Sequence, residues 1–90
     1  MNIYSITYDL RKIRDYNRLY EGINSCSPDN WAKPTESQWF ILSNKTASQI
    51  NAYLSRYIDS DDVLMIVKID HTDCAATNVR ADVRRWLGLA

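Results

Sequence analysis

Residues 2–9, Asn-Ile-Tyr-Ser-Ile-Thr-Tyr-Asp, form the segment around which the rest of this chain is expected to fold. Large side chains at Tyr4, Ile6 and Tyr8 alternate with a second set at the odd positions, which ends in Asp9. Alternation with a period of two, rich in β-branched and aromatic residues, is typical of a half-buried β-strand. The strand therefore ends in a carboxylate, and the basic residues of the next loop follow it directly.

The length and charge of the chain limit what it can be. Its 90 residues are the length of one domain, and we expect a single domain over residues 1–90. A domain this small buries only about 60–65% of its unfolded surface, so dimerisation is a natural way to bury more. The 11 basic and 11 acidic residues give zero net charge, which argues against a strongly basic, sequence-independent nucleic-acid binder but allows a local basic patch.

The sequence also indicates a cellular compartment. Cys26 and Cys74 have no CxxC spacing and no histidine pair beside them, which favours reduced thiols. The N-terminus enters a strand without a basic and apolar signal region, and no segment approaches the roughly 18 apolar residues that span a bilayer. We therefore expect a soluble cytoplasmic protein with no membrane partner.

Three segments have apolar residues at helical spacing, and each follows a residue that can cap a helix. In the first of them the apolar stripe consists of Tyr16, Leu19, Tyr20 and Ile23. The predicted helices run from Tyr16 to about Ser25 after the cap Asp15, from Ala47 to about Ile58 after the cap Thr46, and from the cap Thr77 or Asn78 to about Leu87 before the stop Gly88.

Three further segments are predicted to be strands. Ser37–Leu42 carries large apolar groups on both faces, which indicates a position inside the sheet. Val63–Ile69 is a nearly continuous apolar run, which predicts a strand covered on both faces. Trp31–Lys33 is a short strand candidate.

The order strand, helix, strand, strand, helix, strand, helix predicts an α+β fold of the ferredoxin-like βαββαβ type. Right-handed crossovers place the two main helices on one face of a four-stranded antiparallel sheet. The other face is left open, and an exposed apolar face usually marks an interface. We expect the C-terminal helix or a second copy of the chain to cover it.

Several segments together carry a resemblance to a known group of proteins. Over roughly residues 2–69 the chain resembles the small bacterial and phage proteins called SinR-like, which are similar in turn to the VapD toxin family and to CRISPR-associated protein two. The resemblance implies a ferredoxin-like protomer that dimerises through its sheet. The segments that carry it are Tyr4–Leu10, Asp15–Glu21, Trp31, Glu36–Ile41, Ile50 with Leu54, and Tyr57–Leu64.

The resemblance also implies a site. In the CRISPR and VapD groups an Asp that ends the first strand lies near the dimer axis and faces its symmetry mate, and Asp9 matches it by position. Asp9 is then the implied catalytic residue and metal ligand, with Mg²⁺ shared between two copies. Arg11, Lys12 and Arg14 are implied to hold the nucleic-acid backbone. The zero net charge and the helical C-terminal segment depart from the CRISPR members, which exchange an extra edge strand there.

Each of these residues also has a purely structural interpretation, and the sequence leaves both open. An Asp at a strand end commonly accepts hydrogen bonds from local backbone N–H groups, which is a sufficient role for Asp9. An ordinary solvated loop is the structural alternative for Arg11, Lys12 and Arg14.

Other polar segments point to structural roles. The turn Asp59–Asp62 lacks the Gly and the distant Glu of an EF-hand, so we expect a plain connection between helix and strand. His71 has no nucleophile or positioned partner, and we expect it in an exposed loop. The basic face of Arg80, Arg84 and Arg85 is either solvated or directed at an acidic or nucleic-acid partner.

The aromatic residues Tyr4, Trp31 and Trp39 could stack on bases, as aromatics on open sheets do. The basic and Gly-flanked signature of RNA-recognition motifs is missing, so we expect core or interface packing instead.

Two functions from different classes follow. The first is a homodimeric nucleic-acid-associated protein that acts as a Mg²⁺-dependent endoribonuclease through Asp9 of both chains. The second is a non-catalytic interaction module that binds a protein or a small nucleotide through the dimer cleft. The sequence leaves open whether the first would act on RNA or DNA.

Overall fold

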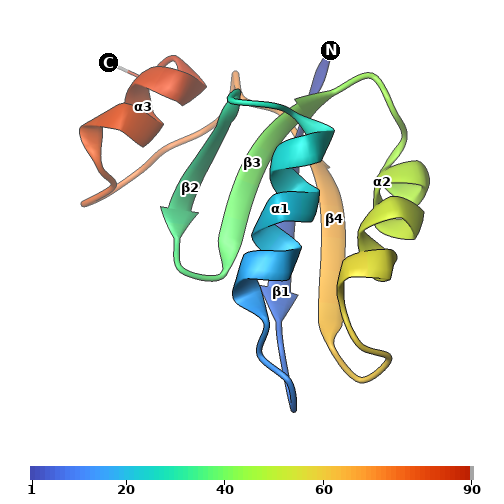
Figure 1. The fold of residues 1–90 in the computed structure, drawn as a ribbon. Coiled ribbons are helices and arrows are strands. Elements are labelled where there is room, and N and C mark those ends of the chain that lie inside the picture. Colours follow the sequence, from blue (N-terminus) through green and yellow to red (C-terminus); the bar gives the residue numbers. More distant parts are fainter. Residues whose placement is uncertain (90) are drawn as a thin grey trace.

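A computed structural model describes residues 1–89 as an α+β structure with a four-stranded antiparallel sheet and three α-helices (Figure 1). The strands lie in the order β2-β3-β1-β4, so β1 and β3 are interior and β2 and β4 form the edges. The elements in chain order are β1 Asn2–Asp9, α1 Tyr16–Cys26, β2 Trp31–Thr35, β3 Gln38–Ser43, α2 Ala47–Leu54, a 3₁₀ turn η1 Ser55–Tyr57, β4 Val63–Ile69 and α3 Ala81–Leu87.

Strand β1 is the centre of the sheet because both of its edges are paired. Tyr4, for example, lies opposite Ile41 of β3 on one side and Lys68 of β4 on the other. The strand is buried on both faces from Ile3 to Ile6, and beyond Ile6 its odd positions, Thr7 and Asp9, become accessible to solvent. The prediction of a half-buried strand therefore holds only at its C-terminal end.

Helices α1 and α2 cover one face of the sheet, as expected. Their buried side chains meet the even-numbered side chains of β1 and the odd-numbered ones of β3. Burying a large apolar side chain is worth about 1.5–3 kcal/mol, so most of the folding energy is concentrated here. The buried residues of this core are Tyr4, Ile6, Tyr8, Leu10, Leu19, Ile23, Trp39, Ile41, Ile50 and Leu54.

Helix α3 covers one part of the opposite face. Val83 and Leu87 pack with Ile3, Ala32 and Phe40 in a second apolar cluster. The Trp86 ring stacks on Phe40 at a centroid distance of 6.4 Å. The end of this face near the C-terminus of β1 is left uncovered.

The expectation that Val63–Ile69 is covered on both faces is wrong for the single chain. The strand has the predicted bounds, but it lies at the sheet edge, and Val63, Met65 and Val67 are 43%, 56% and 45% exposed. An apolar strand is suited to burial, but its composition does not show whether residues of the same chain bury it.

Two helix boundaries also differ from the prediction. The α-helical part of the second helix ends at Leu54 and continues as η1. Helix α3 begins only at Ala81, because Asn78 has a left-handed φ of 59° and Arg80, the N-cap, has an extended ψ of 149°. Gly88 ends α3 with a φ of 77°, as a C-terminal glycine was expected to do. No helix within residues 1–89 is long and apolar enough to cross a bilayer.

Gly22 of α1 provides a test of the packing between α1 and η1. A methyl group on Gly22 would lie 2.7 Å from Cγ of Tyr57, at the base of a ring that cannot retreat easily. Ala is the better helix former by about 1 kcal/mol, but overpacking costs up to about 3 kcal/mol. We expect Gly22→Ala to lower the free energy of unfolding by about 1–2 kcal/mol in urea titrations followed by circular dichroism.

A double-mutant cycle separates the clash from other causes. In a Tyr57→Ala background the same Gly22→Ala substitution should stabilise the protein, since only the helix propensity remains. An equal loss of stability in both backgrounds would show that the ring contact is not responsible.

Candidate functional site

Asp9 lies at the C-terminal end of β1, on the uncovered face of the sheet. It pairs with Val63 in the register of β1 and β4. Directly opposed residues of antiparallel strands project to the same side, and side chains alternate along a strand. Asp9 therefore shares its face with the exposed side chains of Val63, Met65 and Val67.

The carboxylate of Asp9 is paired with a cation of its own chain. Nε of Arg11 lies 3.3 Å from Oδ2 of Asp9, and the two side chains are 56% and 62% exposed. An exposed pair of this kind is worth about 0–1 kcal/mol, so the pairing leaves the carboxylate available to a ligand.

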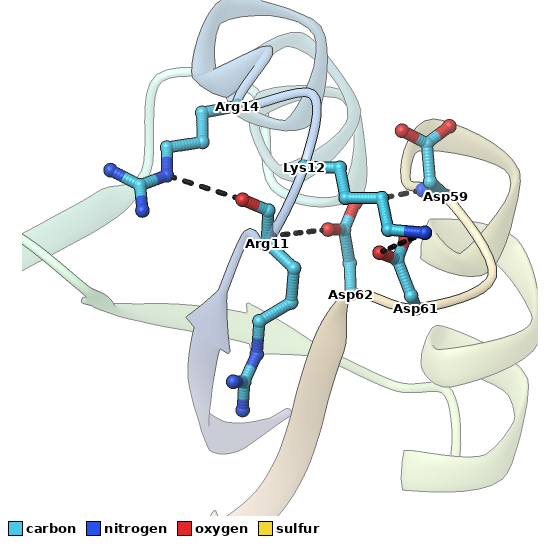
Figure 2. A network of polar contacts seen from close by, with 6 residues as sticks. All are labelled: Arg11, Lys12, Arg14, Asp59, Asp61 and Asp62. Atoms are coloured by element: carbon cyan, nitrogen blue, oxygen red, sulfur yellow. Dashed lines mark hydrogen bonds and ion pairs between the residues drawn. The ribbon is translucent and has the colours of Figure 1, made fainter.

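The loop after β1 is fixed by Asp62, which lies 51 positions from Arg11 in the sequence (Figure 2). The backbone N–H of Arg11 donates to Oδ1 of Asp62 at 2.8 Å, and the backbone N–H of Asp59 donates to Oδ2 at 2.8 Å. These two donors, Arg11 first, hold the pKa of the Asp62 carboxyl below its usual range. The turn Asp59–Asp62 is structural, as expected, and it also positions the basic loop.

The three basic side chains of the loop do not converge. Figure 2 shows Arg11, Lys12 and Arg14 extending in different directions. Nζ of Lys12 lies 4.0 Å from Oδ2 of Asp61, and Nε of Arg14 donates to the backbone carbonyl of Arg11 at 3.4 Å. The structure thus brings Arg11 to Asp9 and leaves the other two cations spread over the loop surface.

The remaining polar candidates occupy structural or exposed positions. His71 is exposed in a loop, as expected. On α3, Nε of Arg80 lies 3.2 Å from Oδ1 of Asp82, and the guanidinium of Arg84 donates to the carbonyl of Ala76 at 3.2 Å. Parts of the predicted basic face are therefore occupied by contacts within the chain.

The three aromatic residues that could stack on bases differ in their burial. Tyr4 and Trp39 are buried, as packing residues should be, whereas Trp31 is exposed and contacts Trp39 at a centroid distance of 4.1 Å. Nε1 of Trp39 donates to the Tyr8 hydroxyl at 3.1 Å. These residues belong to the core and its margin.

An open cleft with a volume of about 520 Å³ lies beside Asp9, and the sequence did not predict it. It lies where the end of β1, the first turns of α1 and the turn between β2 and β3 meet. The spacing of Tyr16 and Tyr20, four apart in the first turns of a helix, is the sequence signal for it, but the same spacing by itself predicts only an apolar helix stripe. The cleft is lined by Tyr8, Asp9, Tyr16, Tyr20, Lys33, Glu36 and Ser37.

The role of Asp62 can be tested by acid unfolding. The pKa of Asp62 in the folded chain is below the unfolded value of about 3.9, so near these pKa values the unfolded chain binds more protons than the folded chain. The ionised carboxylate therefore stabilises the fold above about pH 3.9, and this stabilisation is lost as the pH falls through the folded pKa. We expect Asp62→Asn to lower the thermal midpoint at pH 7 and to flatten the dependence of the midpoint on pH below about 4.

Asp61→Asn is the matched control, since Asp61 accepts neither of the two N–H bonds. Equal effects of both substitutions on the thermal midpoint would contradict the specific role of Asp62.

The donors around Asp9 limit how a metal could bind. Within residues 1–89, no three His, Cys, Asp or Glu side chains come together as a ligand set. A Mg²⁺ ion at Asp9 would therefore take most of its ligands from water, from phosphate or from a second copy of the chain. Comparisons of the chain with protein-family models, with curated proteins and with solved structures give no match. A functional proposal for the chain therefore depends on the arrangement of Asp9, the basic loop and the cleft.

Proposed function

We propose that the chain is a ferredoxin-like protomer of a homodimer that cleaves RNA with Mg²⁺ held by Asp9 of both copies, in the manner its resemblance to VapD and CRISPR-associated protein two implies. Support for the fold assignment is the strand order, which is β4-β1-β3-β2 when counted from the other edge, with α1 and α2 on one face. Helix α3 is an addition to this arrangement.

The exposed apolar stripe on β4 is the observation that carries the proposal. Val63, Met65 and Val67 form a row on a strand whose outer edge has no partner within residues 1–89. Contiguous apolar surface of this kind, rimmed by polar residues, is typical of an interaction site. A second copy is the simplest occupant, because a twofold contact buries the same patch on both chains. Asp9 lies opposite Val63, at one end of the stripe, so a twofold axis near that end would bring the two Asp9 carboxylates toward each other.

Asp9 supplies one carboxylate ligand for Mg²⁺, and the proposed dimer would supply a second from the partner copy. Proteins commonly bind Mg²⁺ through one or two carboxylates, with water and phosphate oxygens as the other ligands. The bound ion would supply an activated water and stabilise charge on the phosphate.

Arg11 has a distinct role in this proposal. Its exposed pair with Asp9 costs little to break, and a released guanidinium can bind a phosphate through two parallel hydrogen bonds. Lys12 and Arg14, on the same loop, would contact neighbouring phosphates.

A second candidate function is a non-catalytic module that binds a protein or small nucleotide. Asp9 and Lys12 each lie beside an opposite charge of the same chain, and the whole chain is neutral. This arrangement lacks the large positive field that most nucleic-acid enzymes use.

The dimer is tested by charging the centre of the stripe. We expect Met65→Lys to weaken self-association at least tenfold, because a twofold contact would bring like charges together, which costs roughly several kcal/mol. Sedimentation over a series of concentrations should show the native chain approaching twice its mass of 10.5 kDa, and the variant remaining near 10.5 kDa. Ala52→Lys, on the exposed side of α2, is the control. A native chain that stays at 10.5 kDa throughout the series would refute the dimer.

The chemistry is tested by removing the charge of Asp9. We expect Asp9→Asn to slow the cleavage of labelled RNA in Mg²⁺ by about 100-fold or more, because a metal's charge stabilisation is worth several kcal/mol and about 1.4 kcal/mol corresponds to a factor of ten. EDTA should abolish cleavage by the native protein, and Asp73→Asn, in an exposed loop, should leave it unchanged. Cleavage that is equal in the native and Asp9→Asn proteins would exclude the mechanism.

A further inference from the structure

We infer that the cleft lined by Tyr8, Tyr16 and Tyr20 binds one unpaired nucleobase of a single strand, and that it favours bases with an exocyclic amino group. The inference rests on the proposed function, which supplies RNA as the polymer that carries the base. The volume of about 520 Å³ lies within the range of small-molecule sites, roughly 300–1,000 Å³.

The aromatic wall of the cleft is preorganised. The three tyrosine rings contact one another in pairs, with centroid distances of 6.3 Å for Tyr8 and Tyr16, 6.0 Å for Tyr8 and Tyr20, and 6.1 Å for Tyr16 and Tyr20. Tyr8, which is 2% exposed, is fixed from below, because its hydroxyl donates to the carbonyl of Glu36 at 2.8 Å and accepts from Trp39 at 3.1 Å. Burial raises the pKa of Tyr8, so this hydroxyl stays protonated.

Tyr16 provides the stacking surface. It is 36% exposed at the start of α1, while its neighbours Tyr8 and Tyr20 hold it from one side. A ring held in this way loses little conformational freedom when a planar ligand stacks on it.

The charges around the cleft favour a neutral ligand. Nζ of Lys33 lies 5.6 Å from the centroid of Tyr20, so the cation position over that ring is already occupied. Asp9 is paired with Arg11, and Glu36 and Lys33 add one charge of each sign to the lining of the cleft. Neither a dianion nor a cation finds an excess of opposite charge here, whereas an uncharged aromatic ring finds a stacking face.

The carboxylates provide the preference among bases. Ionised carboxylates only accept hydrogen bonds, so they favour a ring that presents an amino group. Adenine, cytosine and guanine have an exocyclic amine, and uracil has none. Glu36 is exposed at the rim, and Asp9 also belongs to the proposed metal site, so a base in the cleft would bring its adjoining phosphate toward Asp9. In a duplex the base is paired and stacked, so the cleft selects single strands.

The test is binding of fluorescein-labelled eight-nucleotide oligo(rC) and oligo(rU), followed by anisotropy in EDTA so that no cleavage occurs. We expect the native protein to bind oligo(rC) at least fivefold more tightly than oligo(rU). Tyr16→Ala should weaken binding by about 5- to 100-fold, the cost of losing one base–aromatic stack. Tyr16→Phe should restore it, which separates stacking from a folding defect, and Asn17→Ala on the same helix is the control.

The Glu36→Ala variant tests the preference itself. It should reduce the difference between oligo(rC) and oligo(rU) without weakening oligo(rU), while the hydrogen bond from Tyr8 to the Glu36 backbone stays in place. Equal binding of the two oligomers by the native protein, binding unaffected by Tyr16→Ala, or no binding of either oligomer would each overturn the inference.

The outcomes are separable from those of the proposed nuclease. Binding that depends on Tyr16 and prefers oligo(rC), in a protein that never cleaves RNA, would support the cleft and refute the catalysis. Cleavage that depends on Asp9, together with binding that ignores Tyr16, would do the reverse.

Discussion

The pairing of β1 along both edges is the constraint on which the rest of the structure depends. Because β3 and β4 take up its backbone hydrogen bonds, β1 cannot slip by one residue without turning Tyr4, Ile6 and Tyr8 from the helical core to the opposite face. The same register places Asp9 next to Val63, on the face that α3 leaves uncovered. Core packing and the position of the candidate carboxylate are therefore two results of one alignment.

The loop after β1 is held by a contact that the local sequence does not reveal. Asp62 accepts the backbone N–H of Arg11 across 51 positions, so the turn before β4 fixes the segment that follows β1. The acidic turn therefore orients the backbone of the basic loop, and its carboxylates also attract the basic side chains. Any function of Arg11, Lys12 or Arg14 depends on this attachment.

The sequence predicted those parts of the fold that follow from side-chain periodicity. The alternation in residues 2–9 predicted a strand there, and the apolar groups on both faces of Ser37–Leu42 predicted an interior strand, and both strands are present. The alternation underestimated the burial of residues 2–9, because α3 covers part of the second face. It was wrong about the cover of Val63–Ile69, because composition cannot identify what buries a surface. The predicted start of the last helix was too early, because Asn78 has a left-handed backbone. The cleft was not predicted, because Tyr16 has the spacing of a core residue although it lines the cleft. The ion pair of Asp9 with Arg11 depends on the conformation of the loop, which side-chain periodicity does not predict.

Helix α3 has a consequence for the kinetics of any shared site. Because α3 occupies the part of the face around Ile3 and Phe40, the second copy of the proposed dimer would be confined to the narrow region beside β4. A footprint centred on three side chains falls well short of the roughly 20–30 residues a side in a standard stable interface. Two chains joined there would meet and separate readily, and at low concentration the number of complete sites would grow with the square of the amount of protein. Expression level would then act as a switch, with sparse chains idle and abundant chains competent.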